Sequence, residues 1–185
     1  SVDTDIYLTG LADLWQRDGV RYGLPKDFDT ISIIFNQEAL DAAGVTVEEL
    51  NNATWNPQDG GTFTEIVEKI AATDEFDYGY GADYPGAGAY GQTVFSHFAA
   101  SAGWEVVYGL YATQYNYDDQ TFIDTMQYFQ DQIGNGNFAS YEDMASLGHQ
   151  AAFAAGNIGL TTDGSWTIGF FSTLEDMEVG FAKLP

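Results

Sequence analysis

The chain has 185 residues, a length that suits one ordinary globular domain with its own hydrophobic core. Its 28 acidic and 5 basic residues give a formal net charge of -23, which repels phosphate backbones and argues against nucleic acid as a partner. Hydrophobic residues make up 45% of the chain without forming an apolar run of the ~20 residues that a membrane span requires, and the lack of cysteine excludes disulfides and thiolate metal sites.

The first predicted elements precede and follow a turn. Ile6–Trp15 is an amphipathic segment, and Arg17–Gly19 is predicted to turn the chain. The β-branched and aromatic run Ile31–Phe35 predicts a buried strand. A helix is expected directly after it, because Asn36 can cap its start and Gly44 can end it in a left-handed conformation.

The middle of the chain is predicted to pass from a loop into a helix and then a strand. The loop is Asn51–Gly61, which is rich in Asn, Pro, Asp and Gly. Thr62 and Glu65 have the spacing of a capping box, so a helix is expected from Phe63 to Thr73. The alternating segment Tyr78–Ala82 predicts a strand.

Helices and strands continue to alternate in the second half. Four helices are predicted: Val94–Ala102 before Gly103, a helix from a cap at Asp118 or Asp119 to Gly134, Tyr141–Ala155 before Gly156, and Ser165–Leu174. Strands are predicted at Ile158–Thr162 and Val179–Ala182. The segment Trp104–Tyr111 is expected to be a strand or irregular. This alternation predicts an α/β fold, with helices packed around a small mixed sheet in a single domain over residues 1–185.

Two stretches carry a family resemblance. Tyr22–Val45 reads YGLPKDFDTISIIFNQEALDAAGV, and Ala152–Trp166 reads AFAAGNIGLTTDGSW. The first resembles the GLP loop, strand and "YNK-x-LF-x-x-AG" helix of the maltose-binding-protein-like extracellular solute-binding proteins of carbohydrate ABC transporters. Gln37 stands where that family usually has Lys. The second is similar to the family's "F-x-x-G-x-x-A-M-x-x-x-G-x-W" run, and two matches in order are harder to obtain by accident than one.

The resemblance implies a fold, a function and a location. The fold would be a periplasmic-binding-protein-like class II lobe, mainly the C-terminal one, with the N-terminal lobe absent. The function would be non-catalytic and need no cofactor or metal: two lobes close by a hinge motion on a sugar or oligosaccharide, and the closed form meets the membrane permease. The full protein would be extracellular or periplasmic, anchored as a lipoprotein, although Ser1–Asp5 shows no signal peptide. One lobe alone is expected to bind sugar weakly or undetectably.

Trp166 and Asp29 are the first candidate ligand-binding residues. An indole can stack on the apolar C–H face of a sugar ring, and a carboxylate can accept hydrogen bonds from neighbouring hydroxyls. The resemblance implies these roles for Trp166 and Asp29, which would form one wall of a saccharide cleft. The alternatives are a core tryptophan for Trp166 and solvated loop acids for Asp27 and Asp29.

The other candidates are more loosely matched. Asp27 and Asp163 lie beside Asp29 and Trp166 in the sequence, and Gln92 and Thr93 lie in a region that supplies cleft contacts in the family. The list of predicted ligand-binding residues is therefore Asp27, Asp29, Gln92, Thr93, Asp163 and Trp166. Tyr90 is a further candidate in that region, and Trp104 is expected to be a structural aromatic residue or a residue at the rim of the cleft.

A dinucleotide-binding enzyme is one alternative. Gly86–Gly91 satisfies G-x-G-x-x-G between a predicted strand and a predicted helix, which is the layout of an NAD-type site. Against this, Asp83–Pro85 separates the strand from the glycines, and Asp83 would face a pyrophosphate. The segment Leu110–Ala112 also lacks the acidic residue that should follow about 20 positions on.

Further alternatives are a glycoside hydrolase and a free-standing carbohydrate-binding module. Paired carboxylates such as Asp118 and Asp119 could cleave glycosides, but such pairs arise from composition in so acidic a chain. A carbohydrate-binding module would use Trp166 without needing a second lobe. His97 and His149 stand apart in the sequence, so zinc is not expected and both are predicted to be surface or helix-face residues.

Overall fold

The computed structural model describes residue 3 and residues 5–84, 94–106 and 114–185. It contains two compact units, Ser1–Thr30 and Ile31–Pro185. The assignment of residues 1–185 to a single domain stays a prediction.

The first unit consists of a short helix and a two-stranded hairpin. Helix α1 spans Thr9–Asp13, and strands β1 (Gln16–Arg17) and β2 (Val20–Arg21) pair antiparallel. The predicted turn is confirmed, with left-handed φ values of 51° at Asp18 and 76° at Gly19. Arg21 ties the hairpin to the helix, because its Nη1 donates a hydrogen bond to the carbonyl oxygen of Ala12 at 2.6 Å.

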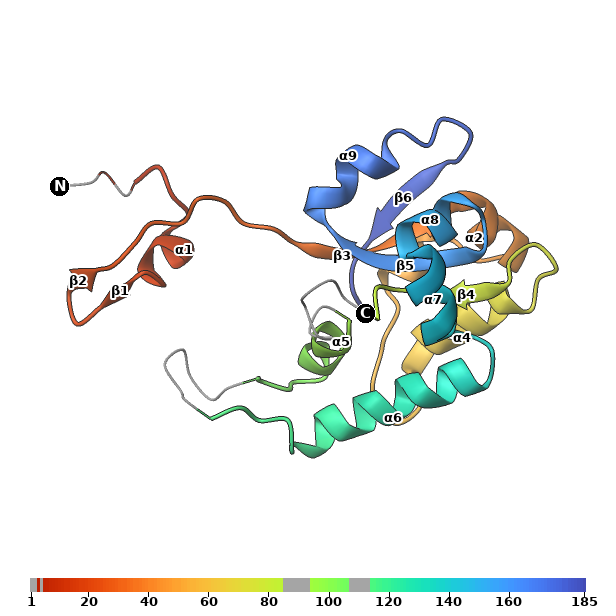
Figure 1. Ribbon diagram of the computed structural model, residues 1–185, viewed down its shortest axis with the longest axis horizontal. Helices are drawn as coiled ribbons and strands as arrows, with labels where there is room; N and C mark the ends of the chain where they lie inside the picture. Colours follow the sequence, from red (N-terminus) through yellow and green to blue (C-terminus); the bar gives the residue numbers. More distant parts are fainter. Residues whose placement is uncertain (1–2, 4, 85–93, 107–113) are drawn as a thin grey trace. The chain divides into compact units, whose positions relative to one another are not determined.

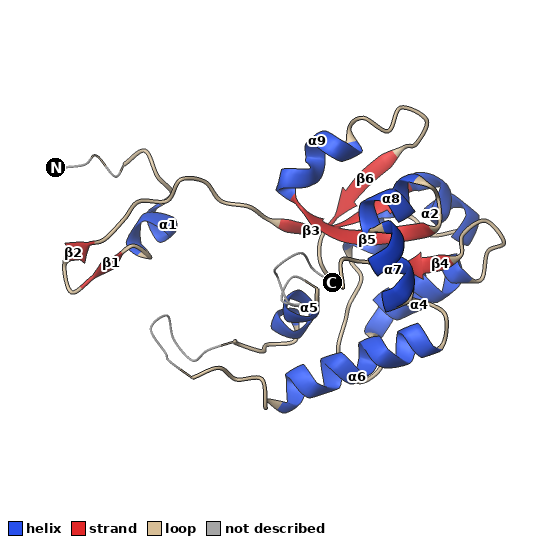
Figure 2. Ribbon diagram, in the orientation of Figure 1, coloured by secondary structure: helices blue, strands red, loops and turns tan. Residues whose placement is uncertain are grey.

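The second unit is built on a four-stranded mixed sheet. Its strands are β3 (Ile31–Asn36), β4 (Tyr78–Tyr80), β5 (Ile158–Gly164) and β6 (Val179–Ala182), in the order β4-β5-β3-β6 (Figures 1 and 2). β3 runs antiparallel to β5 and β6, whereas β4 and β5 are parallel. Ile31 pairs with Gly164, so β3 starts beside the end of β5.

Helices pack around this sheet, as the α/β prediction expected. Their bounds are α2 Gln37–Ala43, α3 Val47–Asn51, α4 Gly61–Ala71, α5 Phe95–Ser101, α6 Gln120–Gly134, α7 Tyr141–Leu147, α8 His149–Ala154, the 3₁₀ helix η1 Ser165–Thr167 and α9 Ile168–Phe171. The predicted ends of α2 are confirmed: the Asn36 side chain accepts a hydrogen bond from the Glu38 N–H at 3.0 Å, and Gly44 has φ 64°. Asp119 caps α6.

The predicted capping box at Thr62 and Glu65 is wrong. Helix α4 begins after Gly60, with no side-chain cap. The Thr62 hydroxyl instead accepts a hydrogen bond from the Thr54 N–H at 2.9 Å, across the loop that leads into the helix. A capping box does occur one helix earlier, at the start of α3, where Thr46 and Glu49 bond each other's backbone N–H groups.

Two other predicted helices differ from the structure. The segment Tyr141–Ala155 forms two helices rather than one, because Gly148 between α7 and α8 adopts φ 83°. The segment Ser165–Leu174 forms η1 and the four-residue α9. Residues 104–106 form no strand, and the rest of the predicted Trp104–Tyr111 segment lies outside the described residues.

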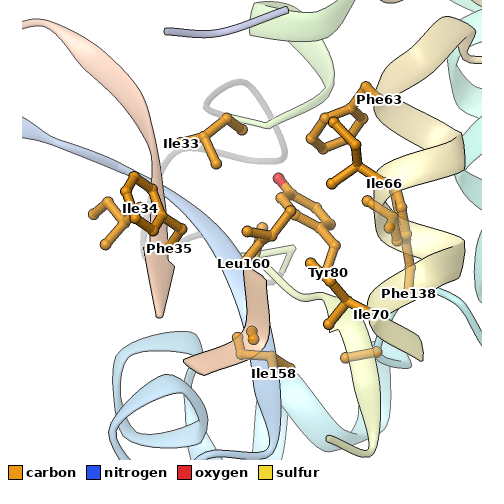
Figure 3. Packing of buried hydrophobic residues seen from close by; sticks show 14 of the residues in the cluster. Ile33, Ile34, Phe35, Phe63, Ile66, Ile70, Tyr80, Phe138, Ile158 and Leu160 are labelled. Carbon is orange, nitrogen blue, oxygen red and sulfur yellow. The ribbon is translucent and has the colours of Figure 1, made fainter. Parts of the chain in front are cut away.

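The core between the sheet and the helices is rich in aromatic rings. Figure 3 shows the ring of Tyr80, from β4, lying between Leu160 of β5 and the α4 residues Phe63 and Ile66. Phe129 of α6, which is 1% exposed, packs with ring centroids 5.0–6.4 Å from five other aromatic rings, those of Tyr84, Phe95, Phe98, Tyr128 and Phe138. Phe98 and Phe138 also contact the ring of Tyr80 in β4, so the aromatic cluster joins α5 and α6 to the sheet.

None of the helices in the described part of the chain combines the length and the apolar character needed to cross a membrane.

Candidate functional site

The site begins where β5 ends. Trp166 lies in η1, directly after the strand, and its side chain leaves the residue 58% exposed. The alternative that Trp166 is a core tryptophan is therefore wrong. The indole lies over Gly164, where a Cβ atom would come within 2.1 Å of the ring, so only glycine leaves room for the ring in this position.

The backbone under the indole is held at both ends of Gly164. Its N–H donates a hydrogen bond to Asp163 Oδ1 at 2.8 Å, and its carbonyl oxygen accepts one from the Thr167 hydroxyl at 2.7 Å. Both bonds are buried. The turn that carries Trp166 is thus fixed by its own neighbours, which places the exposed ring on a rigid support.

Asp163 is held in turn by the start of helix α8. Its Oδ2 lies 2.7 Å from His149 Nε2 and accepts a hydrogen bond from Gln150 Nε2 at 2.9 Å. Because a carboxylate can only accept, the Nε2 of His149 carries the hydrogen. His149 lies on a helix, as predicted, but it is not a surface residue: its side chain is 13% exposed and contacts the predicted site residue Asp163.

A pocket of about 150 Å³ lies beside these groups. Its residues come from the start of β3, from the last part of β5, from the segment after β4 and from helices α5 and α8. Its lining is Ile31, Asp83, Val94, His97, His149, Gln150, Thr162, Asp163 and Trp166. The structure therefore brings Asp163 and Trp166 to one pocket.

Hydrogen bonding keeps Asp163 ionised in this pocket. Burial acts to raise its pKa, but the hydrogen bonds from His149, Gln150 and the Gly164 N–H together outweigh burial, so the pKa lies below the usual value for Asp. His97 behaves differently. Its Nδ1 is buried without a hydrogen-bond partner among the described residues, and burial lowers its pKa, which favours the neutral ring.

The lowered pKa of Asp163 predicts an acid-sensitive contribution to stability. A carboxylate with a depressed folded pKa stabilises the fold above its unfolded pKa, and this stabilisation is lost as the pH falls through the folded pKa. We expect Asp163→Asn to lower the free energy of unfolding by about 2 kcal/mol at neutral pH, since three donors lose a charged acceptor. The difference from the wild type should shrink below about pH 4.

Urea unfolding of both proteins across this pH range measures the difference. Asp74→Asn, at an exposed position after α4, is the matched control for losing one charge. A difference between wild type and Asp163→Asn that grows on acidification would contradict the assignment.

The remaining predicted residues lie elsewhere in the chain. Asp27 and Asp29 are exposed and belong to the first unit, where Asp27 pairs with Lys26 at 3.0 Å, so the predicted wall of Asp29 and Trp166 stays a prediction. Gln92 and Thr93 lie outside the described residues, as do Tyr90 and the Gly86–Gly91 motif.

Trp104 is structural, as expected. It is 5% exposed, and its Nε1 donates a hydrogen bond to the Asn116 carbonyl oxygen at 2.8 Å.

Of the nine lining residues, sequence reasoning predicted only Asp163 and Trp166, and the polar residues that it missed include Asp83, His149 and Gln150. Asp83 follows the predicted strand Tyr78–Ala82, and parallel strands such as β4 and β5 end at the same edge of a sheet. The position of Asp83 directly after a predicted strand could therefore have marked it as a site residue. No such signal marks His149 and Gln150, which reach Asp163 only because Gly148 starts a new helix. No group of His, Cys, Asp or Glu suited to a metal ion is found among the described residues.

Comparison with solved structures identifies the fold. The chain superposes on UspC from M. tuberculosis with a TM-score of 0.75 and 22% identity, covering 100% of this chain and 49% of UspC. It is also similar to UgpB from Mycobacterium tuberculosis in complex with glycerophosphocholine (TM-score 0.72, 15% identity, 100% and 44% covered). A third similar structure is the cyclic alpha-maltosyl-1,6-maltose binding protein from Arthrobacter globiformis (TM-score 0.70, 18% identity, 96% and 42% covered).

These structures confirm the predicted fold class, a periplasmic-binding-protein-like α/β lobe with a small mixed sheet. The chain spans less than half the length of each of the three proteins. No protein-family model and no curated protein sequence matches it.

Proposed function

We propose that this chain is the saccharide-binding lobe of an extracellular solute-binding protein that delivers sugar to an ABC importer. The observation that carries the proposal is the exposed indole of Trp166 on its rigid turn, beside a pocket with polar lining. A sugar ring offers an apolar face of C–H groups and a rim of hydroxyls. The indole suits the face, and the polar groups of the pocket suit the rim.

Two independent lines support this assignment. The Tyr22–Val45 and Ala152–Trp166 segments resemble a carbohydrate-binding family in sequence, and the fold is that of proteins such as the cyclic alpha-maltosyl-1,6-maltose binding protein. In such a protein a second lobe would complete the cleft, the lobes would close on the sugar, and the closed form would be recognised by a membrane permease. The role is non-catalytic, and the full protein would be held outside the cell membrane as a lipoprotein.

The competing functions find less support. The Gly86–Gly91 motif of a dinucleotide enzyme lies outside the described residues, and the described Asp83 before it lines the pocket with a negative charge. A choline site is the second candidate function. Glycerophosphocholine, the ligand of UgpB, contains a quaternary ammonium group, and an indole can bind such a group. The test must therefore separate a choline site from a sugar site.

The test follows the four tryptophan indole N–H signals by NMR while saccharides are added to the ¹⁵N-labelled chain. We expect glucose, galactose or maltose to shift the Trp166 signal, assigned with Trp166→Phe, at millimolar concentrations. The signals of Trp55 and Trp104 should stay in place, because both residues are buried. A half-cleft should bind weakly, so calorimetry should show no micromolar affinity.

Two results would contradict the proposal. A Trp166 signal that moves with choline chloride but with no saccharide would point to a cation site. Micromolar sugar affinity of this chain would refute the expectation that a second lobe completes the cleft.

A further inference from the structure

The charged side chains that line the Trp166 pocket are all acidic. They are Asp83, three residues after β4, and Asp163, near the end of β5. All five basic residues of the chain lie in its described part, and of these only Lys69 and Lys183 belong to the second unit. Both are exposed, and neither lines the pocket. The second unit therefore offers no lysine or arginine to a negatively charged ligand in this pocket.

The two histidines of the pocket do not compensate for this. His97 is partly buried, and burial lowers its pKa, so its ring is neutral near pH 7. His149 donates to Asp163 Oδ2 at 2.7 Å, so any positive charge on its ring is already matched by that carboxylate. Asp83 then leaves the pocket with an excess of negative charge.

The two carboxylates have different positions in the pocket. Asp163 already accepts three hydrogen bonds, from His149, Gln150 and the Gly164 N–H, and its side chain is only 6% exposed. It acts mainly as part of the support under Trp166. Asp83 is more exposed to the pocket, so it is the carboxylate whose charge a ligand meets first.

On the basis of the proposed function, we infer that this pocket selects saccharides by charge, accepting uncharged and amino sugars and rejecting sugars that carry a carboxylate or phosphate. A negative group beside Asp83 meets like charge in a partly desolvated pocket whose lining holds no lysine or arginine. An ammonium group meets the opposite charge, and the face of the Trp166 indole also attracts cations. Rejection of the wrong charge thus comes from the lining itself.

Matched sugars that differ in one substituent test the inference. Glucose, glucosamine and glucuronate form one series, and galactose, galactosamine and galacturonate form another. Each is titrated into the chain at slightly acidic pH and low salt, where the amine is protonated and the uronate is ionised. The Trp166 indole signal is the readout. We expect the uronates to bind at least about tenfold more weakly than the neutral sugars, and the amino sugars at least as tightly as the neutral ones.

Two charge-neutralising variants locate the effect. Asp83→Asn should reduce the discrimination against uronates by about threefold or more, and added salt should reduce it in the wild type. Glu75→Gln removes one exposed negative charge from the turn before β4, at the opposite end of that strand, and should leave the discrimination unchanged. Thermal unfolding of both variants shows whether the fold is retained.

Each outcome gives a decision. Uronates that bind as tightly as neutral sugars overturn the charge selection and leave the proposed sugar site intact. Equal effects of Asp83→Asn and Glu75→Gln overturn the role of Asp83. If no sugar of either series moves the Trp166 signal, the proposed function fails and the charge selection fails with it.

Discussion

Trp166→Ala is expected to weaken saccharide binding by about 30-fold, which corresponds to about 2 kcal/mol, the loss typical of a central aromatic contact. The reason is that no other exposed aromatic ring lines the pocket among the described residues. Stability should change by less than about 0.5 kcal/mol, because the side chain is largely in solvent and packs mainly on Gly164. Because this variant lacks the Trp166 signal, saccharide binding is measured instead from the broadening of the saccharide ¹H signals when the protein is added.

Gly164→Ala is also expected to weaken saccharide binding, by displacing the Trp166 indole instead of removing it. The backbone of Gly164 has φ -101° and ψ 166°, which alanine adopts without strain, but the added Cβ would overlap the indole. We expect the ring to move and binding to fall by at least about tenfold, with the tryptophan still present.

Phe181→Ala is the matched control for both variants, since it removes an exposed aromatic ring from β6, away from the pocket. Unchanged sugar binding in Trp166→Ala would refute the role of the indole. A large loss in Phe181→Ala would show that the effect is not specific to the pocket.

The largest effect on stability is expected from Phe129→Ala. Phe129 is 1% exposed and contacts aromatic rings from α5, from α6 and from the segment after β4. Removing a fully buried phenyl ring leaves a cavity that the surrounding rings cannot fill without moving, so we expect a loss of about 4 kcal/mol in the free energy of unfolding.

Ile123→Ala is the control on the same helix, because Ile123 is 46% exposed. It should cost less than about 1 kcal/mol, so the two variants separate core packing from helix propensity. Urea unfolding followed by far-UV circular dichroism measures both. Equal losses in the two variants would mean that Phe129 does not hold α6 to the core.

Much of the fold could be predicted because its signals are local. A run rich in Ile and Phe at positions 31–35 needs burial on both faces, and it forms β3, one of the two inner strands of the sheet. Asn36 and Gly44 set the ends of α2 through contacts within the helix itself. The capping box at Thr62 failed because its hydroxyl bonds Thr54, a partner that the loop geometry supplies and no local pattern reveals.

The site could be predicted only in part for the same reason. Trp166 and Asp163 lie on one continuous stretch that resembles a known motif, and the structure places both at the pocket. His149 and Gln150 depend on the break at Gly148, and Asp83 depends on β4 lying parallel to β5. Asp27 and Asp29 belong to the first unit, and Gln92 and Thr93 lie outside the described residues, so their roles stay predictions.

The edges of the sheet have a consequence for behaviour at high concentration. On one side, residues 137–139 already pair with the outer edge of β4. The Gly79 N–H donates a hydrogen bond to the Asn137 carbonyl oxygen, and the Ala139 N–H donates one to the Tyr80 carbonyl oxygen. On the other side, β6 is only four residues long, and the next backbone N–H, of Lys183, bonds the Asn51 side chain. Few main-chain groups remain for a second molecule to extend the sheet, which limits fibril-type self-association, and the strong mutual repulsion of such acidic chains opposes it further.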